Sequence, residues 1–230
     1  MAQNPASRST DPLRGLFYNT EQELQMTTLV MFSGGLDSTA ALYKLLTQSD
    51  EPLHVHHVHL VNRDGRDRAE REAVQAVLAW CRANCRPFAY SESTLDFAAL
   101  QAIPIDYLSI AFAACQVAIE VPGCRRIAIG VLAADLDEVK RKVSERQRRA
   151  FEAMYACYRE RKLGEPVVEW VYPVYELSKA QVAASLPPEL RAAAWSCRRP
   201  VPAGSGYRVC GLCKPCRKRA EVSAQLNIAL

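Results

Sequence analysis

The stretch Thr27–Leu46, TTLVMFSGGLDSTAALYKLL, constrains the fold of this chain more than any other part of the sequence. Leu29–Phe32 is a short apolar run of strand formers that ends at Ser33-Gly34-Gly35. From Ser38 onward the apolar residues recur at helical spacing. A strand, a tight glycine turn and the N-terminus of a helix are therefore predicted to meet at Ser33–Thr39.

This junction is suited to hold a phosphate group. The N–H groups at a helix N-terminus are free and carry partial positive charge, and glycines let the backbone approach an anion closely. The residues expected to cradle pyrophosphate are Ser33, Gly34, Gly35, Ser38 and Thr39, and Asp37 is placed to hold a magnesium ion. An ordinary capped turn is the alternative, but seven ordered residues directly behind a strand favour the nucleotide site.

Length and composition limit the class of protein. The 230 residues allow one α/β domain with an appendage. No apolar run approaches the roughly 20 residues of a membrane span, and Met1–Gly15 lacks the apolar core of a signal peptide, so we expect a cytoplasmic protein with no membrane partner. The net charge of +4 permits contact with nucleic acid without arguing for it, and we do not expect nucleic acid as a partner.

Strand-like and helix-like segments alternate through Thr28–Ala184, which predicts an α/β fold with a doubly wound parallel sheet. Further strands are expected at Leu53–Val61, Pro87–Ser91, Arg126–Leu132 and Val167–Tyr175; helices are expected up to about Arg82, over Asp106–Glu120, over Asp137–Arg161 and from Ser178. We predict a leader over residues 1–26, a nucleotide-binding domain over 27–194, and a C-terminal zinc-binding subdomain with a helix over 195–230.

Three stretches allow two interpretations each. Leu53–Val61 contains all four histidines, with His54 and His56 predicted on one side of a strand and His57 and His59 on the other, so a buried strand is favoured over a metal site. Asn62–Arg71 is either a solvated helix face or a source of phosphate or carboxylate contacts through Arg63, Arg66 or Arg68. The basic helix Asp137–Arg161 is either solvated or faces RNA.

Two residues beyond the glycine turn are predicted to act with Asp37 in catalysis. Asp135 follows the strand Arg126–Leu132 through a turn of small residues, where it would orient a base or a carboxylate. Lys179 opens the last predicted helix of the α/β domain, where it would reach the β and γ phosphates. An exposed lysine in a first helical turn is the alternative for Lys179.

The C-terminal cysteines give the second strong signal. Cys197, Cys210, Cys213 and Cys216 have the spacing C-x12-C-x2-C-x2-C. Four thiolates in tetrahedral array suit a structural zinc ion, which would hold together a subdomain with little core of its own. An iron–sulfur cluster and free thiols stay open as alternatives. Cys81, Cys85, Cys115, Cys124 and Cys157 share no ligand spacing and are expected to be packing thiols rather than disulfides.

The SGGLDST loop resembles the SGGxDS signature of the PP-loop ATP pyrophosphatases, which implies cleavage of ATP between its α and β phosphates. Over about residues 27–220 the chain is similar to the QueC family of 7-cyano-7-deazaguanine synthases. The likeness rests on this loop, the four cysteines, Arg68-Ala69-Glu70, Gly130-Val131 with Asp135, Lys179-Ala180 and Ser196-Cys197.

The resemblance implies an ATP-dependent C–N ligase that uses Mg2+ and Zn2+ and forms a homodimer. Such an enzyme adenylates the carboxylate of a small-molecule deazaguanine acid, 7-carboxy-7-deazaguanine. In queuosine biosynthesis ammonia then displaces AMP, and a second activation converts the amide into the nitrile preQ0.

Two stretches near the expected substrate pocket depart from the family. Ile103–Tyr107 stands where the family has Pro-Gly-Arg-Asn, and Leu136–Lys142 stands where it has Ser-Gly-Tyr-Pro-Asp-Cys-Arg. The ATP half and the cysteines match, whereas the acceptor half is altered. A diverged member of an antiviral defence operon, with a protein amine as acceptor, is therefore expected alongside the ammonia-using synthase. The alternatives are a tRNA-modifying PP-loop enzyme and a non-catalytic nucleotide-binding subunit.

Overall fold

The structure is a computed structural model that describes residues 26–103, 105–135 and 168–228, together with 142, 145–146, 149–150 and 152–153. The predicted leader before Met26 lies outside the described residues. So does most of the predicted helix Asp137–Arg161, including all but one residue of the altered stretch Leu136–Lys142.

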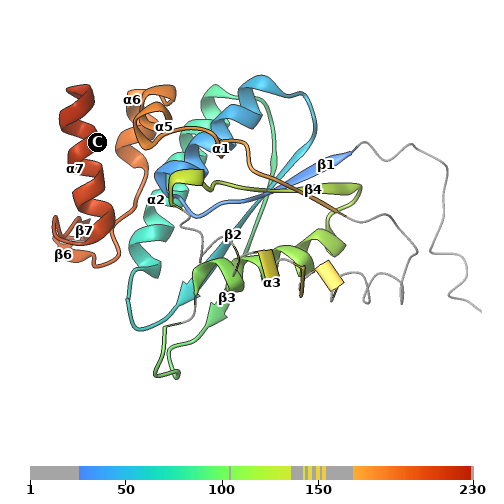
Figure 1. The fold of residues 1–230 in the computed structure, drawn as a ribbon, viewed down its shortest axis with the longest axis horizontal. Coiled ribbons are helices and arrows are strands. Elements are labelled where there is room, and N and C mark those ends of the chain that lie inside the picture. Colours follow the sequence, from blue (N-terminus) through green and yellow to red (C-terminus); the bar gives the residue numbers. More distant parts are fainter. Residues whose placement is uncertain are drawn as a thin grey trace, which may run out of the picture.

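Five parallel strands form the central sheet in the order β3-β2-β1-β4-β5 (Figure 1). They are β1 (Thr27–Met31), β2 (Leu53–Val61), β3 (Ala89–Asp96), β4 (Cys124–Ile129) and β5 (Glu169–Val171). The chain builds outward from β1 to one side and then crosses to the other side. This confirms the predicted doubly wound sheet, and it places the switch of direction between β1 and β4.

Helices cover both faces of this sheet. They are α1 (Leu36–Gln48), α2 (Asp67–Asn84), α3 (Asp106–Glu120), the 3-10 turn η1 (Ala133–Asp135), α5 (Lys179–Ser185), α6 (Pro188–Ala193) and α7 (Lys214–Leu226). A short hairpin of β6 (Val201–Ala203) and β7 (Gly206–Arg208) precedes α7. No helix in the described part of the chain is both long and apolar enough to cross a membrane.

The central strand β1 divides the core into two clusters. Val30 and Phe32 pack with α1, α2 and the C-terminal helices, whereas Leu29 and Met31 pack with α3 on the opposite face. Apolar residues in unbroken succession are therefore needed here, because both faces of a central parallel strand are covered. This explains why the short run before the glycines identified the strand.

Most predicted elements are present, and three strands differ from their predicted limits at both ends. β2 and α3 have the predicted limits, whereas β3 begins two residues later than expected and runs on to Asp96. β4 ends at Ile129 and not at Leu132. β5 has three residues instead of the predicted nine, because after Val171 the chain turns and the Tyr175 N–H donates to the carbonyl of Tyr172.

The histidines of β2 pack against the neighbouring strands, in agreement with the expected buried strand. Ser91 Oγ lies 2.7 Å from both His54 Nε2 and His56 Nδ1, so this pair faces β3 together. His57 Nδ1 lies 2.8 Å from the Phe32 carbonyl on β1's side. Burial lowers the pKa of His56 and His57 to about 4, so both are neutral at physiological pH. Among the described residues no histidine belongs to a group able to hold a metal.

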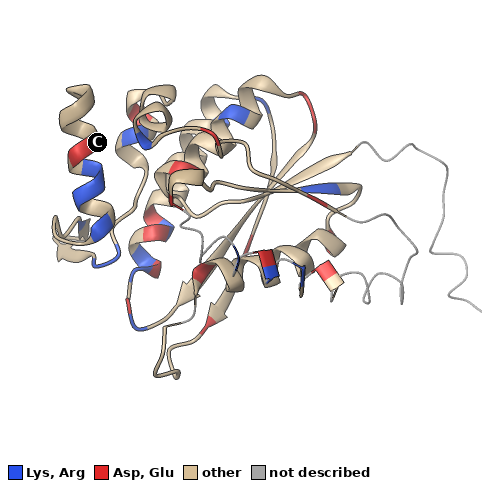
Figure 2. Cartoon of the chain, viewed as in Figure 1, with Lys and Arg blue, Asp and Glu red and all other residues tan. Residues whose placement is uncertain are grey.

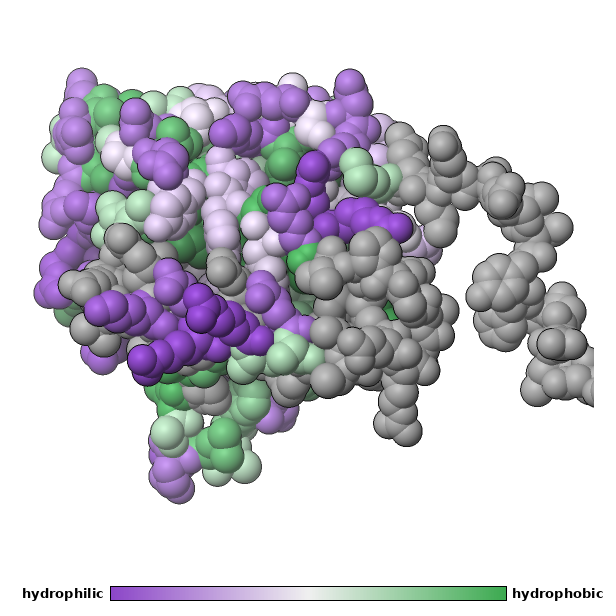
Figure 3. Space-filling model, turned by 45° about the vertical axis from the view of Figure 1, so that its right-hand side comes forward, coloured by the Kyte–Doolittle hydropathy of each residue, from purple (hydrophilic) through white to green (hydrophobic). Residues whose placement is uncertain are grey.

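Apolar side chains are exposed where β3 connects to α3. Leu100, Ile103 and Ile105 are 50%, 44% and 59% exposed, and Figure 3 shows the lower lobe that contains this connection as largely green. Residues 103 and 105 belong to the stretch that departs from the QueC pattern. The altered sequence therefore forms surface next to the start of α3.

Gly130, directly after β4, provides a first test of the fold. A Cβ at this position would lie 2.6 Å from Ser38 N and Cα, both of them backbone atoms of α1. We expect Gly130→Ala to lower the free energy of unfolding by about 1–3 kcal/mol, as overpacking does, measured by urea denaturation. Gly206→Ala is the matched control, since its Cβ would meet only the Glu72 carboxylate, which can move aside. Equal midpoints for the two variants would contradict the close approach.

Candidate nucleotide and metal sites

The turn between β1 and α1 is a tight, hydroxyl-lined loop. Gly34 has φ +73°, and a Cβ there would lie 2.9 Å from Val74 Cγ2, so only glycine fits. Ser38 Oγ lies 3.0 Å from Ser33 Oγ and donates to the Gly35 carbonyl. Gly35 is the N-cap of α1 and supplies no side chain to cap it. The first N–H groups of the helix therefore stay available to an anion.

The structure brings together the three residues predicted to act in catalysis. Lys179 Nζ lies 2.5 Å from Asp37 Oδ2 and 3.8 Å from Asp135 Oδ2. Lys179 is fixed at the start of α5 by a capping box, in which Ser178 and Gln181 exchange hydrogen bonds. Residues 37, 135 and 179 thus meet beside the glycine turn, at the carboxyl edge of the sheet.

Asp37 has one oxygen free for a ligand. Its Oδ1 is buried and has no hydrogen-bond partner in the described part of the chain, and the same holds for Thr39 Oγ1. Burial raises the pKa of Asp37, although the neighbouring Lys179 opposes this effect. A buried carboxylate oxygen without a partner fits a divalent cation such as Mg2+, which binds through one or two carboxylates and phosphate oxygens.

These residues line one side of a cavity of about 1370 Å3. Ligand pockets commonly measure about 300–1,000 Å3, so this cavity has room for a nucleotide and a second reactant. Its other walls come from the start of α2, the start of α3 and the segment of the cysteines. Ile103 and Asp106 lie in this wall, so part of the stretch that departs from the QueC pattern does border the cavity.

A charged network forms the part of the cavity wall beside the glycine turn, where the Glu70 carbonyl lies 3.5 Å from the position of a Cβ at Gly34. The Arg66 side chain is 6% exposed; its Nη2 lies 2.6 Å from Asp106 Oδ2 and its Nε lies 3.3 Å from Glu70 Oε1. Arg198 Nη2 lies 3.3 Å from the same Asp106 oxygen. Burial raises the pKa of Glu70 to about 7. Arg66 was one of three candidate arginines in the sequence, and the other two, Arg63 and Arg68, are exposed and do not line the cavity.

Asp106 and Arg198 were not predicted as site residues. Asp106 was predicted as the first residue of a helix and as part of the altered stretch Ile103–Tyr107, and Arg198 was given no role. They are 92 residues apart, and nothing local in either sequence indicates that they pair. A signal was present in retrospect, because an acidic residue in the first turn of an almost wholly apolar helix is positioned by the helix N-terminus.

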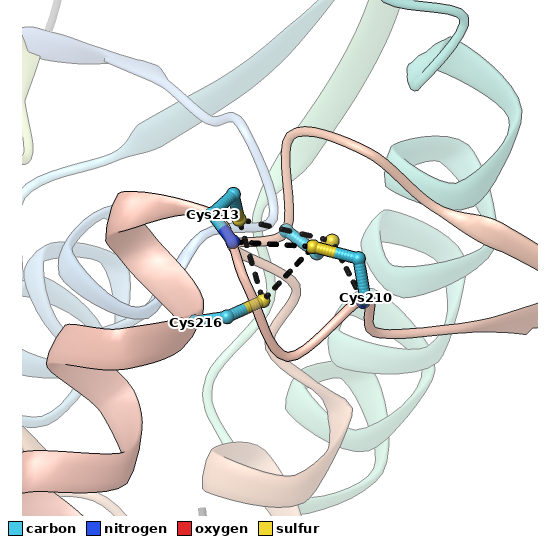
Figure 4. A group of neighbouring side chains, drawn as sticks. Cys210, Cys213 and Cys216 are labelled. Atoms are coloured by element: carbon cyan, nitrogen blue, oxygen red, sulfur yellow. Dashed lines mark hydrogen bonds between the residues drawn. The ribbon is translucent and has the colours of Figure 1, made fainter.

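The four cysteines converge at the start of α7. Their sulfur atoms all lie within 4.8 Å of one another, with Cys213 3.4 Å from Cys216 and 4.0 Å from Cys197 (Figure 4). Backbone N–H groups point at the sulfurs, and those of Cys213 and Leu212 lower the pKa of Cys210 to about 6. These donors favour the thiolate form that binds metal.

The spacing fits a single tetrahedral metal ion. Four sulfurs at about 2.3 Å from a zinc ion are separated by about 3.8 Å, close to the distances found here. In a four-iron cluster each thiolate binds a different iron, which holds the sulfurs farther apart. The geometry therefore favours one ion over a cluster. Of the other cysteines, Cys81, Cys115 and Cys124 are buried as predicted for packing thiols, and Cys157 lies outside the described residues.

The cysteine group is joined directly to the glycine turn. The Trp195 N–H donates to the Gly34 carbonyl at 2.8 Å, and the Trp195 indole donates to the Cys197 carbonyl at 2.9 Å. From α7, Arg219 donates to the carbonyls of Arg191 and Ala194. Cys213 also lines the cavity. A metal bound by the cysteines would thus stabilise one wall of the candidate nucleotide site.

Searches with the sequence found no match among protein-family models and none among curated proteins. Two solved structures are similar in fold. The U34-tRNA thiolase NcsA from Methanococcus maripaludis, solved with its 4Fe–4S cluster, is 17% identical at a TM-score of 0.49, over 90% of this chain and 67% of that chain. A predicted subunit of tRNA methyltransferase from Methanocaldococcus jannaschii is 16% identical at a TM-score of 0.38, over 83% and 99%. Likenesses this weak carry no argument about substrate.

Glu70 predicts a pH dependence of stability. Its pKa is raised from 4.5 to about 7 in the folded protein, so between these values the folded state holds a proton that the unfolded chain has lost. The stability from this proton is present below pH 4.5 and is lost as the pH rises through 7. We expect Glu70→Gln to gain stability relative to the parent protein over this range, measured by urea denaturation at several pH values. Arg66, Arg198, Asp67 and Asp106 face Glu70 in both proteins. If the free energies of unfolding of the two proteins changed with pH in parallel, Glu70 would be an ordinary carboxyl group.

Cys213 tests the metal site. Replacing its sulfur in Cys213→Ser removes one of four ligands, so we expect the purified protein to lose most of its bound zinc, measured by elemental mass spectrometry. Cys85→Ser is the control, because Cys85 is half-buried and lies outside the cysteine group. Equal zinc content in the two variants would exclude the proposed ligand set.

Proposed function

We propose that this protein is a PP-loop ATP pyrophosphatase, an enzyme that cleaves ATP between the α and β phosphates and activates an acceptor as its AMP ester. The observation that supports this best is the uncapped start of α1, flanked by the Ser33 and Ser38 hydroxyls and facing the Asp37–Lys179 pair. Hydroxyl donors, free N–H groups, one cation and one open carboxylate oxygen are the set that a nucleoside triphosphate with its metal requires.

Each residue has a defined role in this proposal. The first N–H groups of α1 and the Ser33 and Ser38 hydroxyls bind the departing pyrophosphate. Lys179 neutralises phosphate charge, and Asp37 Oδ1 would hold Mg2+, which when bound supplies further charge neutralisation for the leaving group. Asp135, exposed at the rim beside Lys179, orients the acceptor.

The acceptor we propose is 7-carboxy-7-deazaguanine, on the strength of the residue-level resemblance to the QueC family. A carboxylate oxygen of the acid attacks the α phosphorus and pyrophosphate leaves. A nitrogen nucleophile then attacks the carbonyl carbon, AMP leaves with the C–O electron pair, and the nitrogen loses a proton to solvent. The size of the cavity supports room for a second reactant. The nucleophile is ammonia or a protein amine.

A second candidate is a tRNA-modifying PP-loop enzyme, which adenylates a base instead of a carboxylic acid. The specific observation in its favour is that Arg199, Lys214 and Arg217 border the same cavity. Arg66 and Arg198 are already paired with Asp106, whereas these three cations form no ion pair in the described part of the chain.

The test is release of AMP and pyrophosphate from ATP and Mg2+ with 7-carboxy-7-deazaguanine, with and without ammonium. We expect AMP from the parent protein and a loss of roughly 100-fold or more in Asp37→Ala, the scale of removing a group that stabilises transition-state charge. Asp50→Ala, an exposed aspartate away from the cavity, should retain activity.

The products separate the acceptors in the same assay. Amide or nitrile formed with ammonium identifies a synthase, and a mass increase on an added protein identifies a conjugating enzyme. AMP formed with tRNA but not with the acid would overturn the deazaguanine acceptor. Full AMP release by Asp37→Ala would remove Asp37 from the mechanism.

A further inference from the structure

One short segment of this protein carries positive charge and no negative charge. Residues 195–220, here the basic segment, contain seven arginines and lysines and no acidic residue: Arg198, Arg199, Arg208, Lys214, Arg217, Lys218 and Arg219. The whole chain has 29 basic and 25 acidic residues, so the rest of the chain has 22 basic against 25 acidic. The net charge of +4 is therefore the sum of a strongly basic segment and a slightly acidic remainder of the chain.

Most of these cations are exposed and unpaired. All except Arg219 are exposed. Within the described part of the chain, Arg199, Arg208, Lys214 and Arg217 form no ion pair, whereas Arg198 pairs with Asp106 and Lys218 with Glu221. A solvated charged face usually interleaves acids with bases, as in the expectation for the helix Asp137–Arg161. The basic segment lacks this feature.

The unpaired cations face the candidate nucleotide site. Arg199, Lys214 and Arg217 line the cavity that also contains the glycine turn, and Arg208 lies on the adjoining hairpin. Figure 2 shows the blue bands on the first half of α7, at the end that carries the cysteines, with the acidic band farther along the helix. The basic surface is thus continuous with the mouth of the site.

Charge balance at the metal does not account for the basic segment. Four thiolates with one divalent ion carry a net charge of about −2. Seven cations exceed that charge several-fold. Arg199 and Arg217 both line the cavity and form no ion pair in the described part of the chain.

We propose that the basic segment binds the sugar–phosphate backbone of a nucleic acid. This binding stands independently of the proposed function, whose acceptor is a small carboxylic acid. Five of the seven cations are arginines, which match phosphate oxygens with two parallel N–H donors. A polyanion also explains why the charges form a row along a segment of the chain instead of one point, as a single carboxylate would need.

The test measures binding of the full-length protein to a labelled RNA hairpin, and to a DNA hairpin of the same sequence, as a function of salt. The variant Arg199→Gln/Arg217→Gln removes two unpaired cations. At about 0.9 counterions per phosphate contact in a duplex stem, the slope of log Kd against log salt should fall by about 1.8, and affinity at 0.1 M salt by about 60-fold. Lys44→Gln/Arg82→Gln, which removes two exposed cations outside the cavity, should leave both values unchanged.

Several results would overturn the proposal. The first is equal RNA affinity of the two double variants. The second is weaker binding to both hairpins than to anionic vesicles, or loss of hairpin binding when polyglutamate competes. The third is loss of ATP binding without loss of RNA binding in Arg199→Gln/Arg217→Gln. The last result would assign both arginines to ATP. Arg208→Gln, in the β6–β7 hairpin, provides a second variant if the first loses zinc, and it should lower the slope by about 0.9.

This test and the test of the proposed function fail separately. Binding is measured without ATP, so a protein that releases no AMP can still bind RNA with the expected slope. A protein that releases AMP normally with a free deazaguanine acid and ignores both hairpins would keep the proposed function and exclude the nucleic-acid surface.

Discussion

The structure depends on how closely backbones approach one another at the carboxyl end of β1. Gly34 leaves no space between the turn and Val74, Gly130 lies against the backbone of Ser38, and the Trp195 N–H reaches the Gly34 carbonyl. Three parts of the chain that are far apart in sequence thus converge on a single turn. The order of the sheet makes this possible, since β1 and β4 are neighbours and the chain reverses direction between them.

Much of the fold could be predicted from sequence, because its strongest signals are local. β2 and α3 have ends marked by proline, glycine or a change of periodicity, and their predicted limits hold. β4 and β5 were predicted too long, since their ends depend on contacts with other elements. β4 stops where α1 begins to crowd Gly130, and β5 stops where its only partner strand ceases to pair. No pattern within either strand records such a neighbour.

The same distinction between local signals and contacts with other elements applies to the candidate site. Asp37, Asp135 and Lys179 were predicted because each follows a strand or opens a helix, and parallel strands carry such positions to one edge. Arg66, Asp106 and Arg198 form another part of the cavity wall by pairing across segments that are far apart in sequence. That pairing follows from topology, and the sequence around each residue is compatible with an ordinary surface charge. The cysteines were visible as a set because their spacing is itself the signal.

The link between the cysteine group and the glycine turn uses backbone atoms of Trp195 and Gly34. This bond does not depend on the side chain at residue 195, whereas the bond from the Trp195 indole to the Cys197 carbonyl does. Both bonds depend on the number of residues between α6 and Cys197. One residue more or fewer would carry the amide out of reach while the metal ligands stayed in place. Selection on this short connector should therefore preserve its length as well as its tryptophan.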